Sequence, residues 1–297
     1  MADKIPILWF ELLPIRTIII PRRWWVVFFS VLLLTGCTLK IAYQYADWIA
    51  LWAVDDYFDL SAEQKTLLEE KVQRHLTWHK QNELHKYSVL LKEFKQKGQD
   101  GLEPEEIEWC FTKIEYLRKN LVQRLLTDTS VFLAGLTQEQ IEFFETQLME
   151  FNESALERVK LPQEERRQRR VDRTLEFSED WFGQLSANQQ EKISQLSRQL
   201  PETFTERIKI RKIRQKEFLE LLRSGSSAKA IETQLAAWFL DVDQSYPPHY
   251  QQMIEKQKEA VKRMMLSIDQ ILTPEQRTHA IEKIDEWIED IDDIISS

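Results

Sequence analysis

The sequence predicts an all-α protein, an elongated antiparallel bundle of helices. Apolar residues recur at spacings of three and four over most of the chain, which is the period of one helix face. Glycine is scarce, with 6 residues in 297, while charged residues make up 30% of the chain. Alternating β-branched runs closed by Asn-Gly or Asp-Gly turns, which predict strands, are missing from the sequence.

An apolar run near the amino terminus ends in small residues and a cysteine. Arg22 and Arg23 precede the run 24–34, which Leu34-Thr35-Gly36-Cys37 closes. The run is far shorter than the roughly 20 apolar residues that span a bilayer. This layout resembles a bacterial lipoprotein signal peptide. The resemblance implies recognition of Leu34, Thr35 and Gly36 by the signal peptidase, cleavage before Cys37, a diacylglycerol on its thiol, and a further acyl chain such as palmitate on its amino group.

The residue after the cysteine bears on the destination of the protein. Thr38 stands where an aspartate favours retention at the inner membrane in the Gram-negative sorting pattern. We therefore expect a lipoprotein of the outer membrane that faces the periplasm, held by two or more acyl chains. Residues 1–36 are then the signal peptide, and residues 37–53 the lipidated tether and first helix. The alternative is an uncleaved amino-terminal anchor or a chance match to the lipoprotein pattern.

Charge and cysteine count narrow the partners and the chemistry. The chain holds 40 basic and 49 acidic side chains, and the part after residue 36 has a formal charge of −11. Nucleic-acid partners need a net basic face, so this class is excluded. With Cys37 lipidated, only Cys110 remains, and one thiol cannot close an intramolecular disulfide. We expect Cys110 to be a buried helix residue.

A Leu-[Ser/Thr]-x-x-Gln pattern occurs four times and predicts four helix starts. The copies begin at Leu60, Leu136, Leu185 and Leu272. In each, the hydroxyl caps the backbone N–H three residues on, and the glutamine returns to the N–H of the capping residue. The pattern is similar to the Leu-Thr-x-x-Gln signature of small periplasmic stress chaperones, which bind unfolded clients. This resemblance covers only the five-residue stretches.

Similar segments around two of these starts suggest an internal duplication. The stretch 55–64 aligns with 179–189, and both are followed by Lys-Glu-Phe, a glycine and aromatic residues in the same order. The hypothesis gives two related helical halves, 54–160 and 179–297, joined by a basic segment at 161–178. Near the end, Ile254, Val261 and Ile268 keep a seven-residue period. With Ile281, Ile284, Ile288, Ile291 and Ile295, they predict a terminal antiparallel hairpin.

Two arginine clusters are candidates for binding an anionic partner. The first contains Arg166, Arg167, Arg170 and Arg173, and the second contains Arg207, Arg211 and Arg214. One interpretation is a docking face for phosphates of lipopolysaccharide or for an acidic protein. The other is a solvated helix face paired with nearby acidic side chains, including those of the carboxy-terminal tail.

The histidines offer one candidate for metal chemistry. His75, His79 and Glu83 are spaced by four and project from one helix face. A zinc ion needs three or four ligands, and helical spacing does not let one ion reach all three, so a site would need help from elsewhere. No His-Glu-x-x-His, Gly-x-Ser-x-Gly or glycine-rich phosphate motif is present in the sequence. The alternative is an interhelical hydrogen-bonding role.

Several segments together are similar to one family of proteins. They are Phe58-Asp59-Leu60-Ser61, Trp78-His79, Glu164-Glu165-Arg166-Arg167 and Pro247-Pro248. The chain resembles a family of uncharacterised Gram-negative lipoproteins that is grouped only as a domain of unknown function. The resemblance implies an all-helical envelope lipoprotein and carries over no activity.

These observations predict a non-enzymatic protein whose only attached group is the lipid on Cys37. It would bind a protein or another envelope component as a chaperone-like or scaffold protein, and its oligomeric state is left open. The first alternative is a metal-binding or metal-dependent hydrolytic protein centred on His75 and His79. The second is a structural spacer between the outer membrane and the cell wall.

Overall fold

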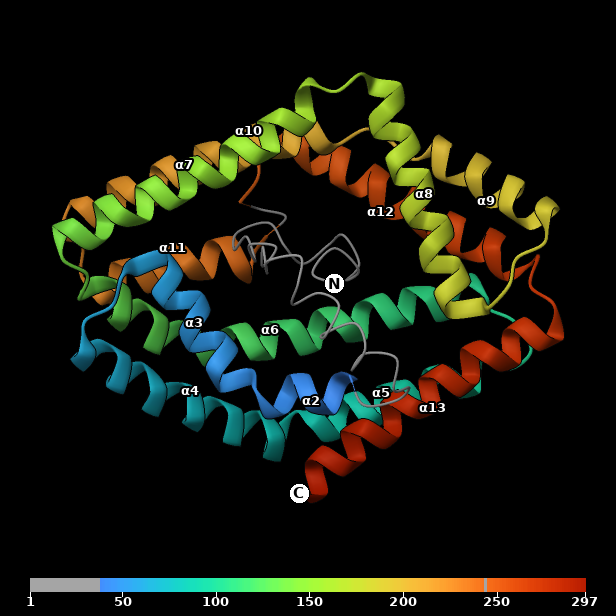
Figure 1. Cartoon of the computed structure of the whole chain (residues 1–297), viewed down its shortest axis with the longest axis horizontal. Coiled ribbons are helices and arrows are strands. Elements are labelled where there is room, and N and C mark those ends of the chain that lie inside the picture. The colour runs from blue at the N-terminus through green and yellow to red at the C-terminus, as the bar shows by residue number, and fades with distance from the viewer. Residues whose placement is uncertain (1–37, 243–244) are drawn as a thin grey trace, which may run out of the picture. The chain divides into compact units, whose positions relative to one another are not determined.

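The computed structural model describes residues 38–242 and 245–297, which form twelve α-helices (Figure 1). In chain order they are α2 Thr38–Gln44, α3 Ala46–Phe58, α4 Ala62–Asn82, α5 Leu84–Lys97, α6 Pro104–Ala134, α7 Gln138–Lys160, α8 Gln163–Phe182, α9 Ala187–Gln199, α10 Phe204–Arg223, α11 Ala228–Phe239, α12 Pro248–Asp269 and α13 Pro274–Ser296. Every regular element in these ranges is a helix, so the predicted all-α class is confirmed. The predicted signal peptide and Cys37 lie outside the described residues.

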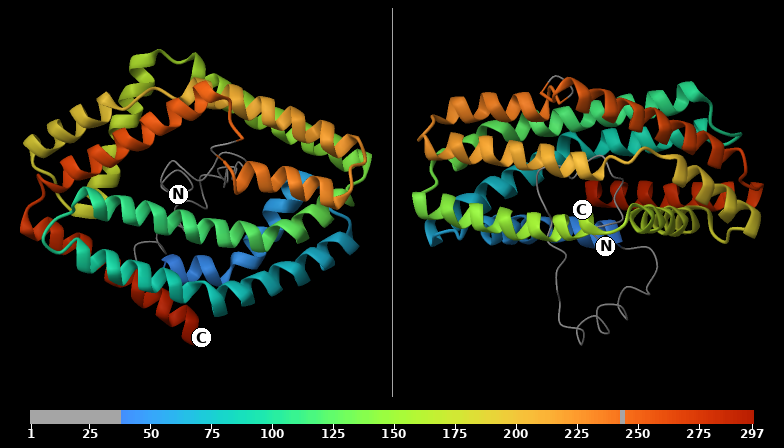
Figure 2. Two further views of the ribbon diagram at one scale, coloured as in Figure 1. Left: turned by 180° about the vertical axis from the view of Figure 1, so that it is seen from behind. Right: turned by 90° about the horizontal axis from the view of Figure 1, so that it is seen from above.

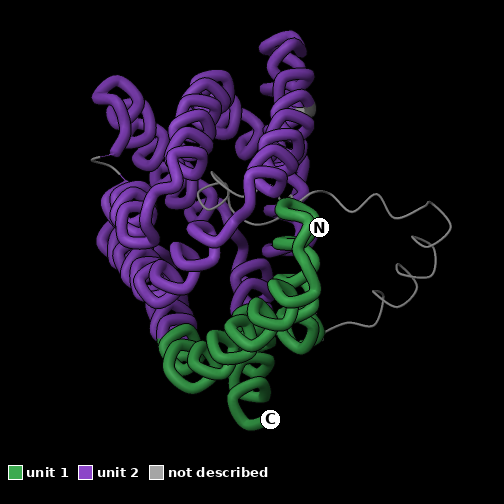
Figure 3. Tube along the Cα trace, turned by 90° about the vertical axis from the view of Figure 1, so that its left-hand side faces the viewer, with its two compact units in different colours: residues 1–89, 284–297 green, residues 90–283 purple. Residues whose placement is uncertain are grey.

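The helices belong to two compact units (Figure 3). Unit 1 contains Met1–Val89 together with Ile284–Ser297, and unit 2 contains Leu90–Lys283. The helices α5 and α13 each run from one unit into the other. Unit 1 therefore combines the beginning and the end of the chain. These limits differ from the halves 54–160 and 179–297, whose common origin stays a prediction.

Unit 2 is a nested set of helix pairs. α6 packs against α11, α7 against α10, and α8 against α9 (Figure 1, Figure 2). The outgoing helices α6, α7 and α8 are thus paired, in reverse order, with the returning helices α9, α10 and α11. α12 then packs against α6 and α9. The chain of unit 2 therefore folds back along itself as one long interrupted hairpin.

The paired helices α7 and α10 are interrupted at matching places. α7 is bounded by a break at 135–137 and by Leu161-Pro162, and its partner α10 is bounded by breaks at 200–203 and 224–227. Pro162 and Pro201 stop their helices because proline lacks an N–H and disfavours the helical conformation of the preceding residue. Gly225 has a φ of 64°, which a residue without a Cβ adopts easily. Both members of the pair therefore end together.

Apolar side chains that face across the pairs build the core of unit 2. Ile107 of α6 and Ile231 of α11 are both fully buried. Phe218 of α10 makes edge contacts with Phe144 of α7 and Trp238 of α11, with ring centroids 6.1 and 5.9 Å apart. Each large apolar side chain buried in this way contributes about 1.5–3 kcal/mol. The ring of Phe218 therefore links the α7–α10 pair to the α6–α11 pair.

The prediction of a terminal antiparallel hairpin is wrong. α12 packs against α6 and α9, and the last part of α13 belongs to unit 1. The isoleucines of the seven-residue period in α12 face two different neighbourhoods instead of α13. Ile254 packs in a cluster with Ile210 and Tyr250, whereas Ile268 packs in another cluster with Ile193.

Unit 1 joins the first described helices to the end of the chain. α2 packs against α3, and α3 packs against α4. The last part of α13 buries Ile284, Ile288, Ile291 and Ile294, the last of these in place of the predicted Ile295. Ser88 Oγ donates a hydrogen bond of 2.8 Å to Asp292, and Lys40 Nζ lies 2.9 Å from the carboxylate of Asp293. The carboxy-terminal acids therefore tie α13 to α5 and α2.

Candidate functional site

The histidine candidates lie in unit 1, where His79 is part of an aromatic stack. Its ring stands between Tyr43 of α2 and Tyr87 of α5, at centroid distances of 5.9 and 5.6 Å. The Tyr43 hydroxyl lies 3.2 Å from His79 Nδ1 and 3.2 Å from the carbonyl oxygen of Leu76. A carbonyl can only accept, so both hydrogen bonds form together when Tyr43 donates to Leu76 and His79 Nδ1–H donates to Tyr43. The stack thereby selects one histidine tautomer.

The third candidate, Glu83, closes the carboxy-terminal end of α4. Glu83 is 1% exposed and follows the last residue of α4. Its Oε1 lies 2.6 Å from Lys86 Nζ, whereas its Oε2 is buried without a hydrogen-bond partner. Nowhere in residues 38–242 and 245–297 do three His, Cys, Asp or Glu side chains come together in a group that could hold a metal ion. The structure therefore does not bring His75, His79 and Glu83 together as a ligand set.

The pKa shifts of His79, Tyr43 and Tyr87 all favour the uncharged form of the ring. Burial lowers the pKa of His79 below its usual 6.5, with the charge of Glu83 opposing the effect. Burial, assisted by the nearby Glu83 and Tyr43, raises the pKa of Tyr87 to about 12. Burial also raises the pKa of Tyr43. At neutral pH the two tyrosines therefore remain protonated, and the stack acts as a hydrogen-bonded core layer rather than as a source of nucleophiles.

We expect His79→Gln to reduce the loss of stability on acidification. Because the pKa of His79 is lower in the folded chain, the unfolded chain takes up a proton first as the pH falls below about 6.5, and the folded state is destabilised. The wild-type melting temperature should fall between pH 7.5 and 5.5 by more than that of the variant. The exposed His85→Gln is the matched control and should behave as the wild type. Equal falls in the wild type and His79→Gln would contradict this role.

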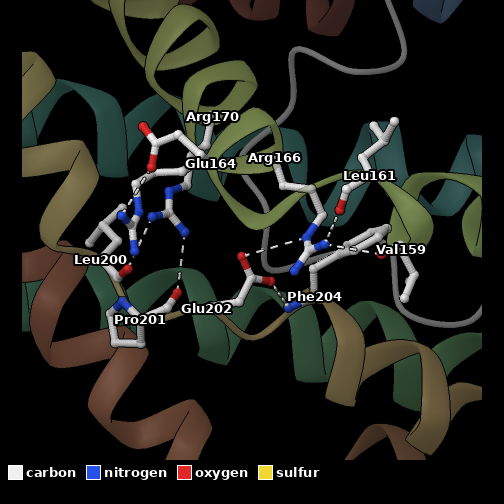
Figure 4. A network of polar contacts seen from close by, with 10 residues as sticks. Val159, Leu161, Glu164, Arg166, Arg170, Leu200, Pro201, Glu202 and Phe204 are labelled. Carbon is white, nitrogen blue, oxygen red and sulfur yellow. Dashed lines mark hydrogen bonds and ion pairs between the residues drawn. The ribbon is translucent and has the colours of Figure 1, made fainter.

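The arginine candidates lie in unit 2, and two of them close helix ends (Figure 4). Arg166 Nη1 donates to the carbonyl oxygens of Val159 and Leu161, at 3.0 and 2.5 Å, where α7 ends. Arg170 donates to the carbonyl oxygens of Leu200 and Pro201, at 3.1 and 3.3 Å, just after α9. Burial lowers the pKa of Arg170 from its usual value. The last carbonyls of a helix lack partners within the helix, and these guanidinium groups supply them.

The other arginine candidates point to several surroundings. Arg214 is buried, donates to Ser245 Oγ at 2.5 Å, and lies 3.7 Å from the ring centroid of Tyr246. Arg211 stands 4.9 Å over the ring of Phe151, Arg167 pairs with a neighbouring glutamate on α8, and Arg207 also has partners. Among the seven predicted arginines only Arg173 is exposed. The structure therefore does not gather them into one exposed anion-binding face.

Cationic side chains from other helices close five helix C-termini in unit 2. Besides Arg166 on α7 and Arg170 after α9, Lys283 donates to the carbonyl of Asp180 in α8, Arg118 to that of Phe239 in α11, and Arg277 to that of Asp269 in α12. Positive charge is also favoured at a helix C-terminus by the helix dipole. Much of the basic content of unit 2 is thus used within the fold.

We expect Arg170→Met to destabilise the protein by about 1–3 kcal/mol. The substitution keeps an apolar stem but leaves the Leu200 and Pro201 carbonyls without their donor. Arg173→Met, at an exposed position of the same helix, is the matched control and should change stability by less than about 0.5 kcal/mol. Urea unfolding followed by circular dichroism measures both. An equally small effect of the two substitutions would show that the turn after α9 does not need Arg170.

All four Leu-[Ser/Thr]-x-x-Gln stretches form the predicted capping boxes. Ser61, Thr137, Ser186 and Thr273 each accept from the N–H of the glutamine three residues on, and each glutamine accepts from the N–H of its cap residue. Two of these boxes, at the starts of α9 and α13, also meet each other. Gln189 Nε2 donates to Gln276 Oε1 at 2.6 Å, and Gln276 Nε2 donates to Gln189 Oε1 at 3.1 Å.

The paired glutamines form a nearly symmetrical junction. Gln189 Nε2 also donates to the carbonyl of Ile271 at 2.7 Å, and Gln276 Nε2 donates to that of Gln184 at 2.9 Å. Each of these carbonyls stands two residues before the capping residue of the other box. Every hydrogen of the two amide groups is donated, and each amide oxygen accepts two hydrogen bonds. The amides therefore join α9 to α13 with no polar group left unsatisfied.

An open hollow of about 410 Å³ lies beside this junction. Its lining includes Phe182, Gly183, Gln189, Gln276 and His279. His279 Nδ1 lies 3.0 Å from the carbonyl oxygen of Trp181, and the two glutamines already satisfy each other. Ligand sites usually enclose their ligand and offer convergent polar groups that are not already engaged. The hollow therefore belongs to the helix junction, and we assign no ligand to it.

We expect Gln189→Ala and Gln276→Ala to be strongly coupled. Each removes the return hydrogen bond of one capping box and both hydrogen bonds to the partner amide, which keeps its bonds to a backbone carbonyl and to the N–H of its own capping residue. A double-mutant cycle in urea should give a coupling energy of about 1 kcal/mol between the two sites. Gln195→Ala, an exposed glutamine on α9, is the control and should be nearly neutral. Additive effects of the two substitutions would contradict direct pairing.

The single described cysteine is not poised for chemistry. Cys110 of α6 is partly buried, and burial raises the pKa of its thiol to about 11. A reactive cysteine needs its thiolate form near neutral pH. Cys110 is therefore a structural thiol of unit 2.

Comparison with known families settles the kinship of the chain. Residues 56–251, about two thirds of the sequence, match a family of unknown function, DUF6279. The chain belongs to the DUF6279 family. The expectation of a family grouped as a domain of unknown function is confirmed. The DUF6279 span begins in α3, ends in α12, and contains helices α4 to α11 complete. Neither the curated proteins nor the solved structures include a match to this chain. The described residues include no helix that is long and apolar enough to cross a membrane.

Proposed function

We propose that this protein is a non-enzymatic envelope lipoprotein that binds another protein or an envelope component. Acyl chains on Cys37 would hold it at the periplasmic face of the outer membrane. The observation that carries the proposal is the order of segments at the amino terminus. A basic flank, the apolar run 24–34 and Leu34-Thr35-Gly36-Cys37 come directly before α2, so the helical body starts one residue after the proposed anchor.

The states of the reactive groups support binding rather than catalysis. The strongest pKa shifts keep Tyr87 and Cys110 protonated at neutral pH, with values of about 12 and about 11. Catalytic groups have pKa values tuned toward the working pH, so a phenol or thiol that acts as a nucleophile or base needs a lowered pKa. The pKa values of Tyr87 and Cys110 are raised instead. The buried arginines are engaged with carbonyl oxygens and aromatic rings.

The lipid anchor is tested with palmitate labelling of the full-length precursor in a Gram-negative host. We expect the wild type to incorporate the label and to fractionate with the outer membrane. Cys37→Ala should lose the label and accumulate as the longer precursor. Cys110→Ala is the matched control, because it removes the other cysteine and should leave labelling unchanged. Label retained in Cys37→Ala, or lost in Cys110→Ala, would contradict the proposal.

The binding role is tested separately with the mature acylated protein. At several-fold molar excess it should slow the aggregation of a chemically unfolded client if the chaperone-like role holds. No effect would remove that role and leave the scaffold role. Proximity labelling in the periplasm then identifies the bound component, and the same labelling with Cys37→Ala shows which contacts depend on the anchor.

A further inference from the structure

The first two described helices carry an unusual distribution of apolar residues. Between Ile41 and Val54 the only charged residue is Asp47. α2 and α3 continue each other through the bend at Tyr45, because the N–H of Tyr45 donates to Ile41 O at 3.2 Å and the N–H of Ile49 donates to Tyr45 O at 2.9 Å (Figure 1). The two helices therefore form one hydrogen-bonded apolar rod, bent at Tyr45, at the start of the described chain.

Four large apolar side chains of this rod point outward. Ile41, Tyr45, Trp48 and Ile49 are 48, 53, 61 and 43% exposed. Ile41 and Tyr45 are four residues apart, as are Tyr45 and Ile49, which is the spacing of neighbours on one helix face. We call these four residues the α2–α3 stripe. Trp48 is the most exposed of the large apolar residues in the described ranges.

The opposite side of the rod packs on the protein. The hydroxyl of Tyr43 reaches Leu76 and His79 of α4, and Asp47 accepts from Gln73 Nε2 at 2.6 Å. A surface helix of a soluble protein normally buries its apolar face and exposes its polar one. Here the one carboxylate faces α4, and the apolar stripe is left outside. The rod is thus arranged for an apolar surface beyond the protein itself.

The position of the stripe along the chain identifies that surface. Under the proposed function residue 37 carries the acyl chains, and an uncleaved amino-terminal anchor would likewise bring it to a membrane. Ile41 is the fourth residue and Trp48 the eleventh residue after residue 37 in the sequence. Tryptophan and tyrosine are the side chains preferred at the level of the lipid headgroups, because each combines an apolar ring with a polar group.

We propose that the α2–α3 stripe lies in the plane of the membrane, with its four side chains inserted among the lipid headgroups and upper acyl chains. This inference rests on the proposed membrane anchor and adds a second contact to it. Amphipathic helices lie in the interface in this way, and a membrane anchor becomes stable when two such signals act together. Because Tyr43 and Asp47 face α4, the insertion also fixes which side of unit 1 faces the lipid.

The test uses the mature acylated protein in vesicles of phosphatidylethanolamine and phosphatidylglycerol. In a Cys110→Ser background, Trp48→Cys is labelled with an environment-sensitive fluorophore. The matched control is Leu67→Cys on α4, which is also an exposed apolar position of unit 1, with 56% exposure. We expect nitroxide-labelled phospholipids to quench the fluorophore at position 48 several-fold more than the one at position 67. Equal quenching at the two positions would overturn the inference.

A second variant removes the stripe without touching the anchor. Trp48→Ser combined with Ile49→Ser alters only exposed side chains, so the helical content and melting temperature should stay close to those of the wild type. A fluorophore at Tyr45→Cys in this variant should lose most of its lipid quenching. Quenching that persists there would contradict insertion of the stripe. Energy transfer between labelled copies without lipid quenching would identify a second copy as the occupant and would also overturn the inference.

Failure of the anchor and failure of the stripe give different results. Palmitate incorporation at Cys37 reports the anchor whether or not the stripe inserts. An acylated protein with no lipid quenching at position 48 would remove the stripe alone. A chain without acylation that is still quenched at position 48 would remove the lipoprotein proposal and keep the stripe, with residues 1–36 retained as an uncleaved amino-terminal anchor.

Discussion

The satisfaction of backbone groups at helix ends is the constraint on which the structure depends. Each helix leaves four N–H groups and four carbonyl groups without partners in the helix, and a chain broken into many helices multiplies this cost. At the amino-terminal ends, four capping boxes made by serine or threonine and a glutamine supply the acceptors. At the carboxy-terminal ends in unit 2, side chains such as Arg166 and Arg170 supply the donors. These contacts give backbone groups at the helix ends hydrogen-bond partners outside their own helix ladder.

The nested pairing of unit 2 follows from those breaks. Because α7 and α10 end together, two turns of the chain lie close together at each end of this pair, and the helix ends at both turns need capping. We call each such pair of turns an elbow. Arg170 links α8 to the turn after α9, so one guanidinium joins the two sides of an elbow. The paired amides of Gln189 and Gln276 do the same between α9 and α13. Polar clusters that would suggest binding in another protein are therefore parts of the framework here.

Because these polar groups are engaged within the fold, exposed side chains without such a structural role are the better candidates for binding a partner. The aromatic stack around His79 is closed by its own hydrogen bonds, and the thiol of Cys110 is held protonated. The α2–α3 stripe is different, because it exposes aromatic and aliphatic side chains while its polar side packs inward. The stripe follows the proposed acylation site Cys37 by only a few residues in the sequence, so the proposed membrane contact would fix the orientation of unit 1. A scaffold or chaperone-like protein at a membrane would need such a fixed orientation to present its other faces to a partner.

The sequence by itself determined the helical class, the four capped helix starts and the kinship with a family of unknown function. The helical class and the helix starts depend on contacts within a few residues, such as Ser186 with Gln189, so local spacing is sufficient to predict them. The tertiary structure alone decided which helices pair, that Ile254 and Ile268 join separate clusters, and that Arg166, Arg170 and Arg214 are engaged inside the fold. Those outcomes depend on residues that are distant in the chain, and an amphipathic period reports that a face is buried without naming its neighbour. The same limit explains why Gln189 and Gln276 were each predictable as caps, whereas their pairing was not.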